Sequence, residues 1–407
     1  RVSEWTFSQM SIWVVSQKHQ LLSHVWDEGC FFISFWPRHS QNGHLPLKHF
    51  IFLEETKMKT NMMKKLLTLT LACAMTLSLA ACGSKAESPP DSPADQNTAA
   101  PTETDAKTYK VAVIKQLDHA SLDEIANAVT AELDQISADK NVKIEYEVTS
   151  GQGDQTILKQ LSDQAIADGV DAIIPIATTA AQIAALSAEE TKTPVVYAAV
   201  SDPETAKLTG IDYVTGTSDA LNTDFIMDMM FAQNPSVAKV GLLYSLSEPN
   251  SAKPIADAKA YLDTKGIEYF EQTANTNDEV VAAASALIAA GVDAVFTPTD
   301  NVIMAAELAI YEDLAKNGIP HYTGADSFVR NGAYATCGVN YTDLGTQTAD
   351  LAYTAMTEGM DGMEDYYLMD GGIITVNTDT CALIGKQADY ACFNSMGEVV
   401  EVTTTKD

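Results

Sequence analysis

Histidine and tryptophan are scarce in most of this sequence, and the familiar catalytic motifs are missing from it. All four tryptophans and five of the seven histidines lie within residues 1–62, which leaves His119 and His321 in the remainder. The chain has no Gly-x-Ser-x-Gly, His-Glu-x-x-His, Walker or Gly-x-Gly-x-x-Gly pattern. Acid–base chemistry by histidine therefore has few candidates, and we expect a protein that is not an enzyme, with neither catalytic residues nor a cofactor.

Basic residues and cysteines are also few. The chain has 25 Lys and Arg against 55 Asp and Glu, a formal net charge of −30. This balance disfavours nucleic acid and anionic membrane surfaces as partners, because both need clustered basic residues. Three cysteines follow Cys82, and their spacing suggests no metal site. We expect Cys337 to be a buried thiol, whereas Cys381 and Cys392 could pair in an oxidising exterior, a question that the sequence leaves open.

Residues 62–81 have the pattern of a secretory signal. Two lysines precede the apolar run Leu66–Ala81, and the run ends in Leu79-Ala80-Ala81-Cys82. This ending resembles the lipobox of bacterial lipoproteins, so we predict that Cys82 is lipidated; a transmembrane anchor is the alternative, but the run is short for a span. Residues 82–108, rich in Pro, Ser, Thr, Ala and Asp, read as a flexible tether. We expect residues 1–61 to precede the true start, against the alternative of a genuine extension.

One stretch of the remaining chain occurs twice. Residues 169–181 (GVDAIIPIATTAA) and 291–303 (GVDAVFTPTDNVI) each combine a buried-strand run with a polar turn that opens a helix. Flanking segments repeat as well, with 143–149 (KIEYEVT) matched by 266–273 (GIEYFEQT). A period this long indicates two similar α/β lobes rather than a solenoid. Two lobes that face each other across a cleft have the shape of a ligand clamp.

Strands alternate with helices throughout both halves, which predicts two doubly wound, parallel-sheet α/β lobes. We place the first lobe at 109–218 and 326–360, and the second at 219–325 and 361–407. Three crossings between the lobes would form a hinge suited to closure around a ligand. Ser121 and Glu124 have capping-box spacing for the first helix. The segment 371–376 is predicted as the final strand.

Ligands of open parallel sheets bind beyond the carboxyl ends of the strands, where helix N-termini also point their free N–H groups. Hydroxyls, amides and a few carboxylates follow the predicted strands, a set that suits a small polar or zwitterionic molecule. The residues expected to contact a ligand are Gln116, His119, Thr178, Thr179, Asp202, Thr217, Ser218, Asp219, Asn250, Ser251, Asp300, Asn301 and Asp326. Tyr341 is either an aromatic wall of the cleft or ordinary core.

Many of these residues have a simpler interpretation as helix N-caps, which Ser, Thr, Asn and Asp favour without any ligand. The two copies of the repeat argue for more than capping. Thr178-Thr179 in one copy aligns with Asp300-Asn301 in the other. An asymmetric ligand would demand such a difference, whereas capping alone would not.

Several motifs resemble those of ABC-transporter substrate-binding lipoproteins of the tryptophan-binding TrpX type, over about residues 109–385. They are 199–203 (AVSDP), 215–219 (TGTSD), 242–245 (LLYS) with 248–251 (EPNS), 298–301 (PTDN), and Gly332-Ala with Asn340-Tyr341 and Leu344-Gly345. The chain departs from the family at His119-Ala120, where His-Pro is common, and at Thr178-Thr179-Ala180, where Thr-Pro-Ala is common. The extra hydroxyl of Thr179 could alter the pocket.

The resemblance implies a type I periplasmic-binding-protein fold and delivery of a ligand to an ABC permease driven by its ATPase. It implies an amino acid, in particular an aromatic one, as ligand, with the binding role carried by Thr178, Ser218, Asp219, Asn250, Ser251, Asp300, Asn301 and Asp326. The expected protein is a monomer outside the cytoplasmic membrane, attached to it only through the lipid. A sugar, nucleoside or purine ligand, and a role as a sensor for a membrane signalling partner, are the alternatives.

Overall fold

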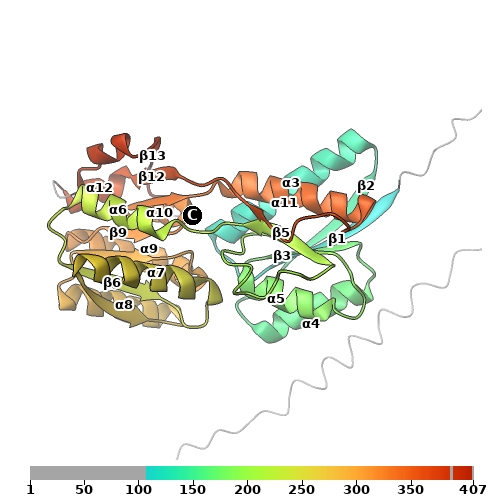
Figure 1. The fold of residues 1–407 in the computed structure, drawn as a ribbon, viewed down its shortest axis with the longest axis horizontal. Helices are drawn as coiled ribbons and strands as arrows, with labels where there is room; N and C mark the ends of the chain where they lie inside the picture. Colours follow the sequence, from blue (N-terminus) through green and yellow to red (C-terminus); the bar gives the residue numbers. More distant parts are fainter. Residues whose placement is uncertain (1–106, 386–387, 406–407) are drawn as a thin grey trace, which may run out of the picture. The chain divides into compact units, whose positions relative to one another are not determined.

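The computed structural model describes residues 107–385 and 388–405, drawn in colour in Figure 1. The predicted signal segment, Cys82, residues 1–61 and nearly all of the predicted tether lie outside these ranges. Among the described residues, no helix combines the length and hydropathy that crossing a membrane requires.

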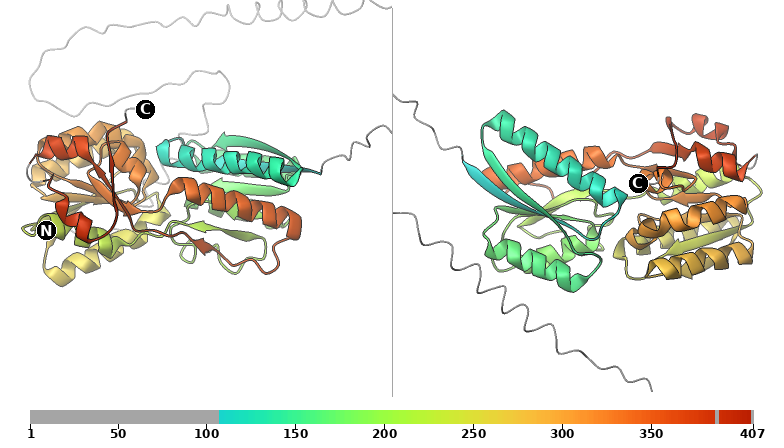
Figure 2. Two further views of the ribbon diagram at one scale, coloured as in Figure 1. Left: turned by 90° about the horizontal axis from the view of Figure 1, so that it is seen from above. Right: turned by 180° about the vertical axis from the view of Figure 1, so that it is seen from behind.

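The first lobe is built on a parallel sheet with the strand order β11-β5-β4-β3-β1-β2. Helices α3 and α11 cover one face of this sheet, and α4 and α5 cover the other (Figures 1 and 2). Its elements are β1 (Thr108–Lys115), α3 (Ala120–Lys140), β2 (Lys143–Ser150), α4 (Gln155–Ala167), β3 (Ala172–Ile176), α5 (Thr178–Ser187), β4 (Val195–Tyr197), β5 (Val214–Ser218), α11 (Tyr341–Glu358) and β11 (Tyr367–Leu368).

The second lobe has a sheet with the order β13-β12-β10-β9-β8-β6-β7, in which only the β10–β12 pairing is antiparallel within the described residues. Helices α6 and α7 pack on one face, and α8 and α9 on the other. The elements are α6 (Thr223–Gln233), β6 (Lys239–Tyr244), α7 (Pro249–Lys265), β7 (Glu268–Thr273), α8 (Asn277–Ala290), β8 (Ala294–Thr297), α9 (Asn301–Lys316), β9 (His321–Thr323), α10 (Asp326–Arg330), β10 (Ala335–Gly338), β12 (Ile373–Asn377), α12 (Thr378–Ile384), η2 (Ala391–Ser395) and β13 (Val399–Val402).

Burial of both sheet faces explains why the central strands are apolar without interruption. In β1, Val111 and Val113 pack in the core under α3 and α11, whereas Ala112 and Ile114 pack in the core under α4 and α5. Successive side chains of a strand point to opposite faces, so a sheet covered on both sides needs apolar residues at every position.

The repeated Gly-Val-Asp-Ala segment is a structural device present in both lobes. Gly169 and Gly291 adopt φ values of 68° and 66°, the left-handed conformation that ends the preceding helix. The side chain of Asp171 accepts a hydrogen bond from the backbone N–H of Lys110 at 2.8 Å, and Asp293 accepts from that of Lys239 at 2.9 Å. Each aspartate thus fixes the central strand to the first strand of its own lobe, so the repeat is scaffold.

The expected lobe boundaries need two corrections. Strand β10 pairs with β9 and β12 and so belongs to the second sheet, although we placed residues 326–360 in the first lobe. Strand β11 pairs with β5 of the first sheet, although we placed it in the second lobe. The chain still crosses between the sheets three times: between β5 and α6, between β10 and α11, and between β11 and β12.

The C-terminal region holds more structure than expected. The strand predicted over 371–376 is β12, and it is followed by α12, η2 and β13, which pairs with it in parallel. Cys337 is buried, as expected, and desolvation raises the pKa of its thiol to about 11. Cys381 and Cys392 are free thiols in this structure.

Candidate functional site: a polar cavity between the lobes

A small cavity lies where the carboxyl ends of the two sheets meet. The centres of water-sized spheres can occupy about 20 Å³ of it, which is room for about one water molecule. Its lining comes from both lobes: His119, Ser121, Leu122, Ala177, Thr178, Ala199, Ser201, Asp219 and Tyr341 from the first lobe and its crossings, and Asn250, Thr299, Asp300, Asn301, Met304, Ala325 and Phe328 from the second. Six of the thirteen predicted ligand-binding residues are therefore brought together here.

Asp219 places a buried carboxyl group at the cavity. It accepts hydrogen bonds from the Ser201 hydroxyl at 2.8 Å and from the Tyr341 hydroxyl at 3.0 Å. Ser201 also contacts the Thr299 hydroxyl of the second lobe at 3.1 Å. Burial raises the pKa of Asp219, and the two hydroxyl donors oppose that rise. Tyr341 is thus part of the cavity wall, the first of the two roles that the sequence allowed.

Three buried polar atoms of cavity residues have no hydrogen-bond partner within the described part of the chain: His119 Nδ1, Thr178 Oγ1 and Asn250 Oδ1. The rest of each group is held in place, since Asn250 Nδ2 donates to the Thr299 carbonyl at 2.6 Å and His119 Nε2 contacts Asn301 Oδ1 at 3.0 Å. A buried polar atom without a partner costs about 1–3 kcal/mol. Three such atoms around one cavity indicate a site built for a polar ligand.

Two alanines at the cavity adopt a left-handed φ, 79° at Ala177 and 55° at Ala199. A side chain with a Cβ rarely takes this conformation, and such strain gathers at ligand clamps. Ala177 is also the N-cap of α5 and supplies no side-chain cap to its first turn. The start of α5, next to Thr178, is therefore suited to an anionic group.

An apolar wall completes the cavity, and sequence reasoning missed it. It consists of Leu122 on α3, Met304 on α9 and Phe328 on α10. Leu122 and Met304 each follow a polar cavity residue by one helical turn, His119 and Asn301. That spacing is the only signal in the sequence, and it does not separate a ligand wall from ordinary core.

The other predicted residues lie behind or beside the cavity. Thr217 shares a hydrogen bond with Thr348, Ser218 donates to the Ser201 carbonyl, and Ser251 donates to Asp300. Asp202 accepts from the backbone N–H of Thr205 in the turn that follows it. Gln116 and Thr179 line an adjacent pocket of about 300 Å³ together with Glu248. Asp300 borders the cavity, but both of its carboxylate oxygens are occupied: they accept from the N–H groups of Ser245, Val302 and Ile303 and from the Ser251 hydroxyl. The capping interpretation therefore describes Asp300 correctly.

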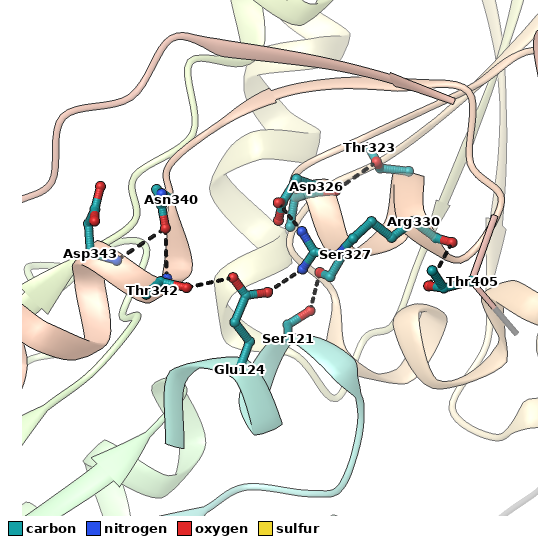
Figure 3. A network of polar contacts seen from close by, with 11 residues as sticks. Ser121, Glu124, Thr323, Asp326, Ser327, Arg330, Asn340, Thr342, Asp343 and Thr405 are labelled. Carbon is teal, nitrogen blue, oxygen red and sulfur yellow. Dashed lines mark hydrogen bonds and ion pairs between the residues drawn. The ribbon is translucent and has the colours of Figure 1, made fainter. Parts of the chain in front are cut away.

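Asp326 takes part in a contact between the lobes instead of lining the cavity (Figure 3). Arg330 on α10 pairs with Asp326 on its own helix and with Glu124 on α3 of the first lobe. The Ser121 and Ser327 hydroxyls also contact each other across the lobes. The predicted capping box of Ser121 and Glu124 is therefore wrong, because both side chains reach the other lobe and His119 occupies the N-cap position. Arg330 is the one arginine of the chain after Arg38.

Two α/β lobes with a polar cavity at the carboxyl ends of both sheets define the class of type I periplasmic binding proteins. Within that class, the chain belongs to the family of ABC transporter substrate binding proteins, whose family model matches residues 110–366. A substrate binding protein of this family binds a small-molecule ligand outside the cytoplasm and works with an ABC permease as a transport component rather than an enzyme.

Named relatives support this assignment. A tyrosine-binding protein of Clostridioides difficile (strain R20291) is 28% identical over 292 residues, which cover 70% of this chain and 83% of the relative. An ABC domain from Streptococcus pneumonia, solved in complex with L-Trp, is 26% identical with a TM-score of 0.63 and covers 71% of this chain and 100% of that chain. A conserved domain protein from Vibrio cholerae is also 26% identical, with a TM-score of 0.65, over 72% and 99% of the two chains.

Replacement of Asp300 by alanine tests the capping interpretation. The change removes four accepted hydrogen bonds and leaves the Ser245 N–H and the Ser251 hydroxyl buried without partners, so we expect the free energy of unfolding to fall by about 3 kcal/mol or more. Asp154→Ala is the matched control, because Asp154 caps α4 at the surface through two N–H groups, and should cost about 1 kcal/mol. Urea unfolding of the ligand-free proteins measures both, and equal losses would contradict the interpretation.

Replacement of Arg330 by methionine tests the contact in Figure 3. The change leaves the half-buried carboxyl groups of Glu124 and Asp326 without their counter-charge, so we expect a loss of about 1–3 kcal/mol in the free energy of unfolding. Adding Glu124→Gln to this variant should restore part of the lost free energy of unfolding. Lys253→Met, in an exposed pair with Asp257, should cost less than about 0.5 kcal/mol. Additive losses in the Arg330 and Glu124 double-mutant cycle would show that the pair does not couple the lobes.

Proposed function

We propose that this protein is the lipid-anchored solute-binding protein of an ABC importer and that it binds an aromatic amino acid in the cavity between its lobes. One observation carries the choice of ligand. A buried carboxyl group, a helix start whose N-cap is an alanine, and an apolar wall surround one cavity, and these complement the ammonium, carboxylate and side chain of an amino acid. The named ligands of two relatives, tyrosine and L-Trp, favour an aromatic side chain.

Each part of the ligand has a partner in this arrangement. The ammonium group would bind Asp219, whose carboxylate is already oriented by Ser201 and Tyr341. The ligand carboxylate would bind at the start of α5, where Thr178 has an unpartnered hydroxyl. The ring would pack against Leu122, Met304 and Phe328.

The size of the cavity implies movement. Space for about one water molecule cannot hold an aromatic amino acid. The lobes must therefore move apart for the ligand to enter, and contacts from both lobes would then favour closure by their differential affinity for the closed state. Delivery to the permease and anchoring through Cys82 complete the proposed role.

Calorimetric titration with the aromatic amino acids tests the ligand, and Asp219→Asn tests its orientation. This substitution keeps the size of the side chain but removes the charge that would pair with the ammonium group, so we expect affinity to fall about 10- to 100-fold. Asp202→Asn is the control, since Asp202 caps a turn away from the cavity. Absence of heat with every aromatic amino acid would refute the ligand assignment, and titration with sugars, nucleosides and purines would then follow.

A further inference from the structure

A chain of side-chain hydrogen bonds runs from the start of α5 to His119, and its first link has a fixed direction. The backbone N–H of Thr179 donates to Gln116 Oε1 at 3.1 Å. A backbone N–H can only donate, so the oxygen of the Gln116 amide must face it. The amide nitrogen of Gln116 then donates to Glu248 Oε1 at 2.6 Å, across the lobes.

The Glu248 carboxylate also fixes the orientation of the Asn301 amide. Glu248 Oε2 accepts from Asn301 Nδ2 at 2.6 Å, which turns Asn301 Oδ1 toward His119 Nε2, 3.0 Å away. An amide oxygen can only accept, so His119 Nε2 must carry the proton. His119 Nδ1 is then an acceptor, and this is the unpartnered buried nitrogen of the cavity.

Protonation of Glu248 would reverse the direction of the hydrogen bonds that link Glu248, Asn301 and His119. Oε1 faces the N–H of Gln116, so the acid proton would reside on Oε2, and Asn301 would have to turn its amide to accept it. Asn301 Nδ2 would then donate to His119 Nε2, and His119 Nδ1 would carry the ring proton instead. The same cavity nitrogen would change from an acceptor to a donor.

The surroundings make Glu248 the group that titrates. Burial, together with the nearby charge of Asp300, raises the pKa of Glu248 to about 8. Asp300, in the turn before α9, is the charged neighbour that acts on Glu248. His119, in the loop after β1, is influenced in turn by Asp123, Lys115 and Asp118. Asp300 accepts four hydrogen bonds, whereas Glu248 accepts three, from the side-chain amides of Gln116 and Asn301 and from the Asn301 backbone N–H, so Asp300 is held ionised more strongly. Desolvation lowers the pKa of His119 to about 4, so its ring stays neutral.

We propose that Glu248 determines, through Asn301, whether His119 presents an acceptor or a donor to the ligand. His119 lies one helical turn from Leu122, and Asn301 one turn from Met304, and all four residues line the cavity. On the proposed function, His119 Nδ1 contacts the ring of the ligand. An indole N–H can only donate and needs the acceptor form, a phenolic hydroxyl suits either form, and a phenyl ring uses neither.

The tautomer of His119 can be measured without any ligand. Nitrogen-15 NMR of the full chain, labelled at histidine and assigned with His119→Gln, should find the proton on Nε2 well above the Glu248 pKa and on Nδ1 well below it. Glu248→Gln should keep the proton on His119 Nδ1 at both pH values, because the amide N–H of the new glutamine donates to Asn301. Asn301→Leu should remove the dependence on pH. The tautomer of His321, held by Glu307 and Thr297, should not respond to Glu248→Gln. A proton that stays on Nε2 in Glu248→Gln would overturn the proposal.

Ligand selectivity is the second measurement. At a pH above the Glu248 pKa, Glu248→Gln should lower the affinity for tryptophan about tenfold or more relative to that for phenylalanine, while the affinity for tyrosine changes little. Equal changes for all three would mean that Glu248 only supports the structure, and would overturn the assignment of His119 to the ring. If none of the three binds, the proposed function fails, whereas the tautomer measurement still decides the role of Glu248.

Discussion

The carboxyl group of Asp219 joins the crossings between the lobes to the polar cavity. Asp219 follows β5, where the chain leaves the first lobe, and Tyr341 opens α11, where the chain returns to it. The hydrogen bond between them ties the outgoing and returning crossings together, and Ser201 extends the connection to Thr299 of the second lobe. A ligand that binds Asp219 would therefore act directly on the segments that join the lobes.

The two-lobed fold could be predicted from the sequence because its main signal is local and repeated. Gly-Val-Asp-Ala combines a glycine that ends a helix with an aspartate that fixes a strand, and both lobes use the pair in the same way. The boundaries were harder to predict. Strand β10 looks like any other short apolar strand, and only its pairing with β9 and β12 places it in the second sheet.

The site could be predicted only in part, for a physical reason. Helix capping and ligand binding use the same residue types at the same place, so Asp300 and Asn250 could not be told apart from the sequence. The structure separates them: the donors around Asp300 occupy its carboxylate, whereas Asn250 keeps one buried oxygen without a partner. Capping-box spacing was misleading at Ser121 and Glu124 for the same reason. Ser121 contacts Ser327 and Glu124 pairs with Arg330, both in the other lobe, and neither side chain caps the helix.

Arg330 places a single protease site in the contact between the lobes. It is the one arginine after Arg38, and its side chain is only 29% exposed between Glu124 and Asp326. A protease that cuts after arginine has a single target in the two lobes, and that target is covered while they are in contact. Cleavage between Arg330 and Asn331 would require two openings: release of the Arg330 side chain from Glu124 of the first lobe, and release of its carbonyl from the Thr405 N–H.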